Sequence, residues 1–320
     1  MAGELYCPHC YKQFGFEDML YYKPSCGEKV QPKTAGQKKI ESSGRADMLL
    51  CNKDKQIKCR SCDRKLAFRA CPFCKNMVPA SMCEKPLFIA VTGATGSGKS
   101  RYIQAVVEQL RKLSEIFKWT LIQQESTNDR NTVLRIQKST QDKGKLLVLV
   151  EAGGEELTPA LMSTLAGVIC LVDPLQSKDV RAAIETQKHI PLPPYTGESA
   201  QAVLSRLGRQ GALVPLAITL AKMDTIITSA ACSPNRWFFN SNECMVCRDS
   251  SLQSTLVMEE LETINCEIES WLTAVYPQDF TACRPFEKRI FLGCSSENPA
   301  LRTEDALLWV LYQNKIINAR

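Results

Sequence analysis

The chain lacks any long hydrophobic run: none of its segments approaches the roughly 20 consecutive apolar residues that a membrane-spanning helix requires. We therefore expect no membrane partner. The first ten residues also lack the apolar core of a secretory signal peptide, which favours a cytoplasmic protein. Histidine is scarce: His189 precedes a proline-rich segment that we interpret as an extended linker, and His9 lies within a cysteine pair.

Cysteine, by contrast, is abundant, with sixteen residues in the chain and nine of them before position 84. In a small secreted chain this number would indicate disulfides, but no signal peptide is present. Six of the nine form C-x-x-C pairs, a spacing that presents two thiolates to one tetrahedral Zn²⁺ ion. We therefore predict a small zinc-binding module over residues 1–85, in which the metal is structural.

Two quartets of zinc ligands are expected in this module. The first consists of two C-x-x-C pairs separated by eight residues: Cys59, Cys62, Cys71 and Cys74. The second combines one pair with two single cysteines: Cys7, Cys10, Cys26 and Cys51. The single cysteines are followed by Gly27 and Asn52, which tolerate tight turns. Cys83 and His9 remain alternative ligands of this second site.

The module is basic. Residues 1–86 carry 16 Lys and Arg against 9 Asp and Glu, a net charge of +7, whereas the remainder carries −1. Such a surplus is compatible with nucleic-acid binding. Each Zn²⁺ held by four thiolates has a net charge of −2, however, so the same surplus also balances two metal sites. The charge leaves both interpretations open.

Residues 93–100 read G-A-T-G-S-G-K-S, a complete Walker A phosphate-binding loop. An apolar stretch at 87–91 predicts a strand before it, and apolar residues at helical spacing predict a helix after it. In such a loop backbone N–H groups surround the phosphates, the lysine reaches the β- and γ-phosphates, and the hydroxyl ligates Mg²⁺. The expected binding residues are Gly93, Ala94, Thr95, Gly96, Ser97, Gly98, Lys99, Ser100 and Arg101.

Further apolar stretches alternate with helical patterns to the end of the chain. The expected strands are 146–150, 167–172, 213–219 and 289–294, and the expected helices are 176–188, 198–208, 252–275 and 304–317. This alternation predicts an α/β fold: a P-loop mononucleotide-binding domain over residues 86–320 with a mostly parallel sheet, preceded by the zinc module. The ligand should lie at the carboxyl ends of the strands.

Two more motifs follow expected strands. Glu151 and Gly154 resemble the Asp-x-x-Gly motif of GTPases, in which the carboxylate holds Mg²⁺ through water and the glycine approaches the γ-phosphate. Lys222 and Asp224 resemble the Asn-Lys-x-Asp motif. One carboxylate accepts both the N1–H and the exocyclic amine of guanine, and the lysine stem lies across the ring. In this chain Ala221 replaces the Asn that normally braces the motif.

In this order, the three motifs resemble translation-factor-related (TRAFAC-like) P-loop GTPases over residues 88–296. Val-Asp-Pro-Leu at 172–175 and the N-terminal Cys-Pro-x-Cys are similar to bacterial double-GTPase families of multi-gene conflict or defence-type systems. The resemblance implies a switch that binds GTP with Mg²⁺ and hydrolyses it slowly, in concert with unidentified protein partners. It gives catalytic roles to Lys99, Ser100, Glu151 and Gly154, and it places Ser295 beside the guanine.

Two alternatives remain at this stage. In an ATPase, Glu151 would act as a Walker B acid and Asp224 would not select the base. In a non-catalytic binding module, the nucleotide would only stabilise the fold. The switch-I threonine is also open between Thr120, Thr127 and Thr132, and Glu155 stands where many GTPases have a water-positioning Gln.

Overall fold

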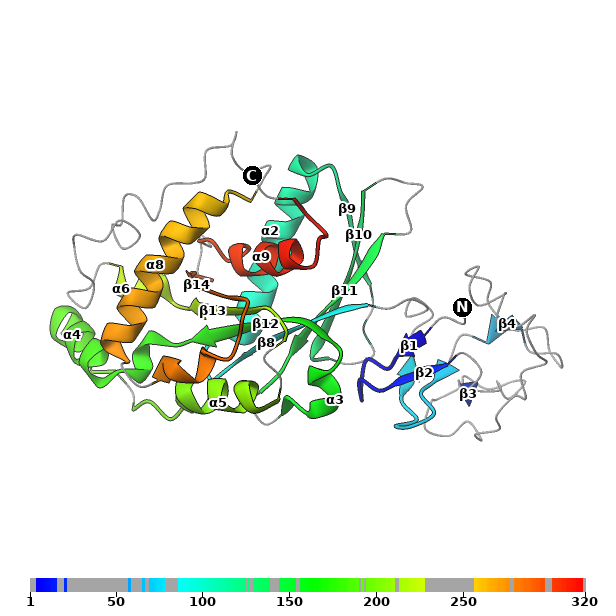
Figure 1. Ribbon diagram of the computed structural model, residues 1–320, viewed down its shortest axis with the longest axis horizontal. Coiled ribbons are helices and arrows are strands. Elements are labelled where there is room, and N and C mark those ends of the chain that lie inside the picture. The colour runs from blue at the N-terminus through cyan, green and yellow to red at the C-terminus, as the bar shows by residue number, and fades with distance from the viewer. Residues whose placement is uncertain are drawn as a thin grey trace. The chain divides into compact units, whose positions relative to one another are not determined.

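The structure is a computed structural model, and it describes most of the chain (Figure 1). The described residues are 4–15, 20–21, 57–58, 65–66, 69–78, 86–124, 126, 129–138, 144–153, 156–189, 191–192, 194–210, 213–227, 256–276, 279–296 and 301–318. They belong to two compact units, one of residues 1–87, 123–135 and 145–148, the other of residues 88–122, 136–144 and 149–320. The first unit thus includes two later segments besides the N-terminal one that the sequence indicates.

A seven-stranded sheet in the order β14-β13-β12-β8-β11-β10-β9 forms the centre of the fold. Its strands are β8 (Leu87–Gly93), β9 (Thr120–Gln124), β10 (Asn131–Gln137), β11 (Lys145–Glu151), β12 (Leu165–Val172), β13 (Leu216–Leu220) and β14 (Arg289–Gly293). The pairs β8–β12, β12–β13 and β13–β14 are parallel. The mostly parallel sheet expected from the sequence is confirmed.

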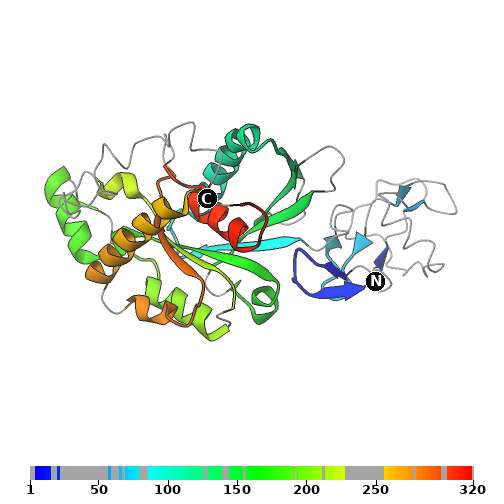
Figure 2. The same ribbon diagram turned by 45° about the horizontal axis from the view of Figure 1, so that its top comes forward.

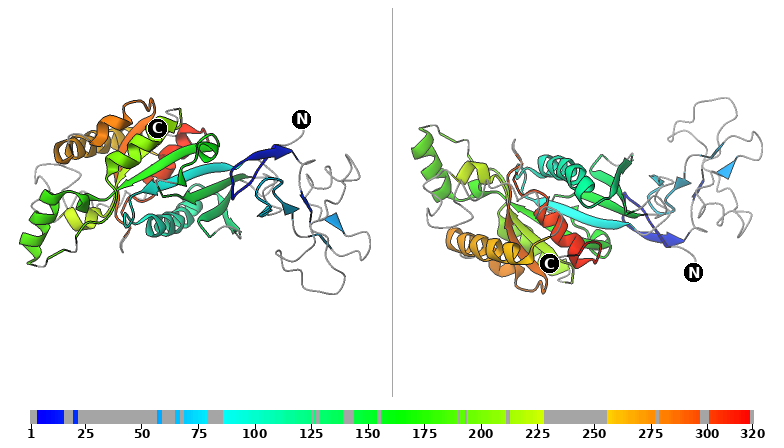
Figure 3. Two further views of the ribbon diagram at one scale, coloured as in Figure 1. Left: turned by 90° about the horizontal axis from the view of Figure 1, so that it is seen from below. Right: turned by 90° about the horizontal axis from the view of Figure 1, so that it is seen from above.

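Helices lie on both faces of this sheet. The helices are α2 (Lys99–Ile116), α3 (Pro159–Met162), α4 (Lys178–Lys188), α5 (Ala200–Gln210), α6 (Met223–Ile226), α8 (Met258–Val275) and α9 (Asp305–Gln313), with 3-10 turns η3 (Pro174–Gln176) and η5 (Asp279–Cys283). In the views of Figures 2 and 3, α2 lies on one side and α8 and α9 on the other. None of the described helices is long and apolar enough to cross a membrane.

The central strands are apolar along their whole length because both faces are covered. The side chains of β8 from Phe88 to Val91 are buried, as are those of β12 from Val168 to Val172. Helix α9 packs so closely on β12 that a Cβ at Gly167 would overlap the side chain of Val310. The loops at the carboxyl ends of β8 and β12 therefore begin from strands that are packed within the core.

Some boundaries differ from the sequence expectation, and two strands were not expected. The strand expected at 213–219 begins only at Leu216, because Leu213 is 90% exposed in a turn. Strands β9 and β10 were not expected: β9 is largely exposed, so it has no apolar run that would indicate a strand. The last helix ends at Gln313 rather than at residue 317.

The described residues of the first unit form three small β-structures. Strands β1 (Glu4–Tyr6) and β2 (Gln13–Gly15) form an antiparallel hairpin. Strands β3 (Leu20–Tyr21), β6 (Arg69–Ala70) and β7 (Met77–Val78) form a second antiparallel sheet, and β4 (Ile57–Lys58) pairs with β5 (Lys65–Leu66). Strands this short cannot bury much apolar surface, so cross-links are expected to contribute to their stability.

Candidate functional site

The Walker A loop joins β8 to α2, as the sequence predicts. Its three glycines have positive φ angles: 145° at Gly93, 79° at Gly96 and 90° at Gly98. A Cβ at Gly93 would also lie 2.5 Å from the carbonyl oxygen of Leu171, so the loop starts where no other side chain fits. Gly98 is the N-cap of α2 and provides no side-chain acceptor, which leaves the amide end of the helix for an anion.

The Lys99 ammonium lies inside the loop. Its Nζ donates to the carbonyl oxygens of Gly93 at 3.1 Å and Ala94 at 2.9 Å. Burial lowers the pKa of Lys99, and the nearby Glu151 carboxylate opposes that shift. A half-buried ammonium that is bound only to neutral carbonyls favours the approach of an anion, and phosphate oxygens meet that requirement.

Ser100, in the first turn of α2, lies against Glu151, the last residue of β11. The Ser100 hydroxyl donates to Oε1 of Glu151 at 2.8 Å, although 51 positions separate the two residues. They meet because β8 and β11 are direct neighbours in the sheet, and the amide of Ala152 continues that pairing to Val91 at 3.0 Å. A hydroxyl and a carboxylate in contact are oxygen ligands of the kind that Mg²⁺ accepts.

A second cluster forms at the ends of β13 and β14. Lys222 has a left-handed backbone (φ 54°) at the start of α6, and Asp224 follows within that turn. The hydroxyl of the fully buried Ser295 donates to Oδ1 of Asp224 at 2.5 Å. The amide of Met223 donates to the carbonyl of Cys294 at 3.1 Å, which fixes the turn against β14. The structure thus places Ser295 against Asp224, two positions after Lys222.

Asp173 also belongs to this cluster. It follows the last residue of β12 and is buried, and its Oδ2 accepts from Nζ of Lys222 at 2.7 Å. Its Oδ1 accepts from the amide of Leu175 at 2.9 Å. Sequence reasoning missed this residue, although its position directly after an apolar strand, like that of Glu151, was the available signal.

The segment before α5 approaches the phosphate loop. A Cβ at Gly197 would lie 3.0 Å from the carbonyl oxygen of Thr95, so the two backbones are in close contact. The Tyr195 hydroxyl donates to the carbonyl of Glu198 at 3.2 Å. Burial raises the pKa of Tyr195 to about 12, and the charges of Asp173 and Glu198 contribute. The proline-rich segment after α4 is therefore more than a linker: it leads to one side of the phosphate loop.

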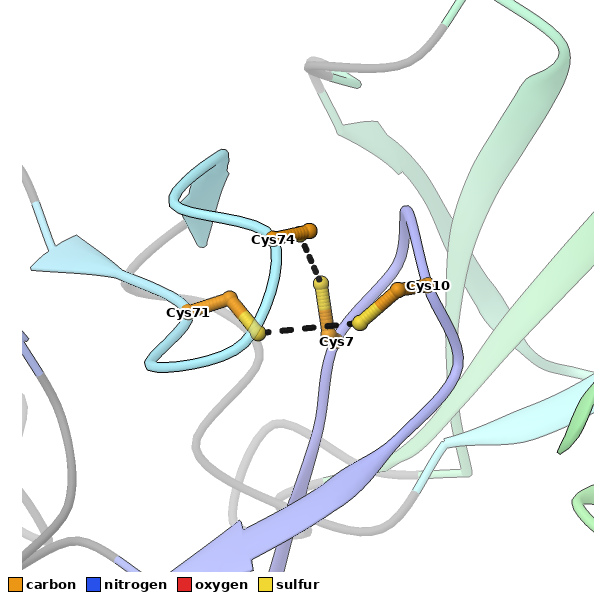
Figure 4. Close-up of side chains that lie close together, drawn as sticks. All are labelled: Cys7, Cys10, Cys71 and Cys74. Atoms are coloured by element: carbon orange, nitrogen blue, oxygen red, sulfur yellow. Dashed lines mark hydrogen bonds between the residues drawn. The ribbon is translucent and has the colours of Figure 1, made fainter.

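A cluster of four cysteines lies in the first unit (Figure 4). Their sulfur atoms all lie within 4.8 Å of one another, with Cys7 and Cys74 at 3.6 Å and Cys10 and Cys71 at 3.7 Å. A tetrahedral zinc ion with Zn–S bonds of about 2.3 Å requires S···S edges of about 3.8 Å. The four thiols therefore have the spacing of a Cys₄ site.

The two C-x-x-C pairs are built alike. Each is the turn of a hairpin, and amides of His9 and Phe73 donate to the first sulfur of their pair at 3.3 and 3.4 Å. Tyr11 and Lys75, directly after the pairs, both have left-handed backbones. Burial raises the pKa of Cys7 well above its usual range, so a cation is needed before that thiol ionises.

This cluster corrects the expected ligand sets. Cys71 and Cys74 lie with Cys7 and Cys10, whereas the sequence led us to expect these two pairs in different quartets, and that expectation is wrong for the two pairs. The shared Cys-Pro-x-Cys sequence of both pairs was the signal for the observed match. Four other predicted ligands lie outside the described residues: Cys26, Cys51, Cys59 and Cys62.

Some predicted residues remain apart from these clusters or untested. Arg101 is on the exposed side of α2, Thr120 begins β9, and Thr132 lies in β10. Gly154, Glu155 and Thr127 lie outside the described residues. The buried Ser97, in the middle of the loop, has an Oγ with no partner in the described part of the chain, and a bound phosphate or water would supply one.

One comparison with known protein families gives a match. A family model described as the viral superfamily 1 RNA helicase core domain matches residues 89–204, about a third of the chain. No curated protein matches the chain. Similar solved structures include a GTP-binding protein of Sulfolobus solfataricus with GDP (14% identity, TM-score 0.30, covering 71% of this chain and 53% of that one).

Two further solved structures are GTP-binding proteins. Translation elongation factor SelB of Methanococcus maripaludis with a GTP analogue has 10% identity and a TM-score of 0.31, over 74% of this chain and 35% of that one. The SAR1-type GTPase of Encephalitozoon cuniculi with GDP has 12% identity and a TM-score of 0.34, over 72% and 82%. The chain thus spans about half of the first of these structures and a third of the second. Likeness at this level carries no argument about function.

The sheet, the glycine loop and the helix that follows it define the class: the chain has the fold of a P-loop nucleoside triphosphatase, and a possible metal-binding cysteine cluster lies near its N-terminus.

The loop geometry makes a first prediction. Gly93→Ala should lower nucleotide affinity at least about tenfold, because the new Cβ would clash with the backbone of β12 at a φ that disfavours alanine. Gly153→Ala is the matched control, since its Cβ would meet only Glu156 at 3.5 Å. Competition with a fluorescent nucleotide measures both variants. Equal affinities in the two variants would contradict the prediction.

Proposed function

We propose that the chain is a guanine-nucleotide-dependent switch that binds GTP with Mg²⁺ and hydrolyses it slowly. One observation carries the proposal: a phosphate-type cluster and a base-type cluster lie at the ends of strands of one sheet. Ser100 with Glu151 marks the first, and Asp224 with Ser295 the second. A nucleotide whose phosphates lie in the loop would then present its base to Asp224.

In this proposal the residues have separate roles. Lys99 neutralises the phosphates, and Ser100 and Glu151 hold the metal, which supplies charge stabilisation when it is bound. Gly154 contacts the γ-phosphate. The exposed carboxylate of Asp224 accepts the two donors of guanine, and the hydrogen bond from Ser295 fixes its orientation. The cysteine cluster holds a structural zinc ion, and protein or nucleic-acid partners bind the basic module.

The second candidate is an ATPase. The family-model match to a helicase core favours it, and Glu151 would then be the Walker B acid. That match ends at residue 204, before Lys222 and Asp224, so it leaves these two residues unexplained. Base selectivity separates the two candidates.

Asp224→Asn tests the proposal. The carboxylate accepts two donors, whereas an amide offers one acceptor and one donor, a pattern that matches xanthine rather than guanine. The variant should lose about a hundredfold in GDP affinity and gain affinity for xanthosine diphosphate. Fluorescent-nucleotide competition with GDP, XDP and ADP measures this.

Asp179→Asn, a matched change of an exposed carboxylate in the first turn of α4, should leave all three affinities unchanged. A wild-type protein that binds ADP as tightly as GDP, with no change in Asp224→Asn, would support the ATPase instead. Mass spectrometry of nucleotide retained by the purified protein gives an independent answer.

A further inference from the structure

Lys222 is the residue of the base-type cluster whose anchoring is unusual. The alanine before it contributes only its backbone, with the Ala221 amide bound to the carbonyl of Val172 at 2.9 Å. A methyl side chain cannot brace the turn by hydrogen bonding. The left-handed backbone of Lys222 would therefore depend on another contact to keep the side chain in one place.

Asp173 supplies that contact. Its side chain is 3% exposed and that of Lys222 is 34% exposed, so the ion pair lies at the edge of the core rather than on the open surface. Both carboxylate oxygens are occupied, one by Lys222 and one by the amide of Leu175. A carboxylate fixed at both oxygens cannot swing away, and it holds the ammonium in one geometry.

Burial raises the pKa of Tyr195, and the charge of Asp173 contributes to that shift. Tyr195 belongs to the segment whose Gly197 contacts Thr95. Asp173 directly follows β12, which lies between β13 and β8 in the sheet, so it lies between the strand that leads to Lys222 and the strand that leads to the phosphate loop.

We propose that Asp173 is a positioning residue: it holds the Lys222 side chain across the purine ring and so replaces the bracing side chain that is absent at position 221. The inference rests on the proposed function. It gives Lys222 and Asp224 different roles. Lys222, held by Asp173, would bind any purine, whereas Asp224 would select among purines.

The test is a double-mutant cycle with Asp173→Asn and Lys222→Met. Asp173→Asn keeps an oxygen for the Leu175 amide and removes only the charge that holds Lys222. Each single variant should lose about tenfold in affinity for both GDP and IDP, and the double variant should lose no more than either single one. The GDP-to-IDP ratio should stay at the wild-type value, because Asp224 still recognises the exocyclic amine of guanine.

Inorganic tripolyphosphate, used as a competitor, contacts only the phosphate loop and should bind all variants equally. Asp179→Asn is again the matched control. Unchanged purine affinity in Asp173→Asn, additive losses in the double variant, or an equal loss for tripolyphosphate would each overturn the inference. The proposed function is tested separately, by the ratio of the wild-type affinities for GDP and ADP. If the two affinities are equal, the double-mutant cycle is measured with ADP instead of GDP.

Discussion

Lys99→Met should remove nucleotide binding almost completely. Two carbonyls of its own loop accept hydrogen bonds from the ammonium, and burial lowers its pKa although the Glu151 carboxylate opposes that shift, so its charge is only partly compensated there. A bound triphosphate would supply that compensation. Methionine keeps the length and the apolar stem but removes the charge, and we expect affinity for GTP to fall at least about a hundredfold.

The reason for so large an effect is the geometry of the loop. The glycines fix the backbone and α2 presents its amide end, but neither carries a full positive charge. Lys99 is the full charge that the structure places within the loop itself. Isothermal calorimetry with GDP and GTP, in the presence and absence of Mg²⁺, measures the loss.

Lys112→Met is the matched control, because that lysine is exposed on the same helix. It should bind nucleotide like the wild type. Circular dichroism should show the same helix content in both variants. Nucleotide binding by Lys99→Met within threefold of the control would mean that the loop does not bind phosphate in the expected way.

The fold was largely predictable because its signals are local. Near-continuous apolar strands such as β8 and β12 have the hydrophobic pattern that is typical of a parallel sheet covered on both faces. The glycine loop needs its glycines for reasons that are visible residue by residue. Strand β9 was not predictable in this way, because it is an edge strand of the sheet and its side chains are mostly exposed.

The site was predictable only in part because contacts between distant strands depend on sheet order. Nothing local in the sequence indicates that Asp173 meets Lys222, since 49 positions separate them. The same holds in the first unit, where the buried side chain of Asn131, at the start of β10, donates to the carbonyl of Pro8 at 2.8 Å. That bond joins the first cysteine pair to a segment that the sequence assigned to the nucleotide domain.

The second large effect concerns the cysteine cluster. Cys71→Ser should remove one zinc ion per chain and unfold the hairpins that the metal joins. The strands concerned are two or three residues long, so they bury too little surface to remain folded alone. Structural zinc contributes on the order of 10–16 kcal/mol in small modules, which is as large as the whole net stability of a typical domain.

The zinc content of the purified protein, measured by inductively coupled plasma mass spectrometry, should fall by one ion in Cys71→Ser. Limited proteolysis should then cut within residues 1–87. Cys266→Ser, which changes an exposed cysteine on α8, is the matched control and should keep the wild-type metal content and protease resistance. The fall is counted from the wild-type value because other cysteines of the module lie outside the described residues. Full metal content in Cys71→Ser would show that the four clustered sulfurs do not share one ion.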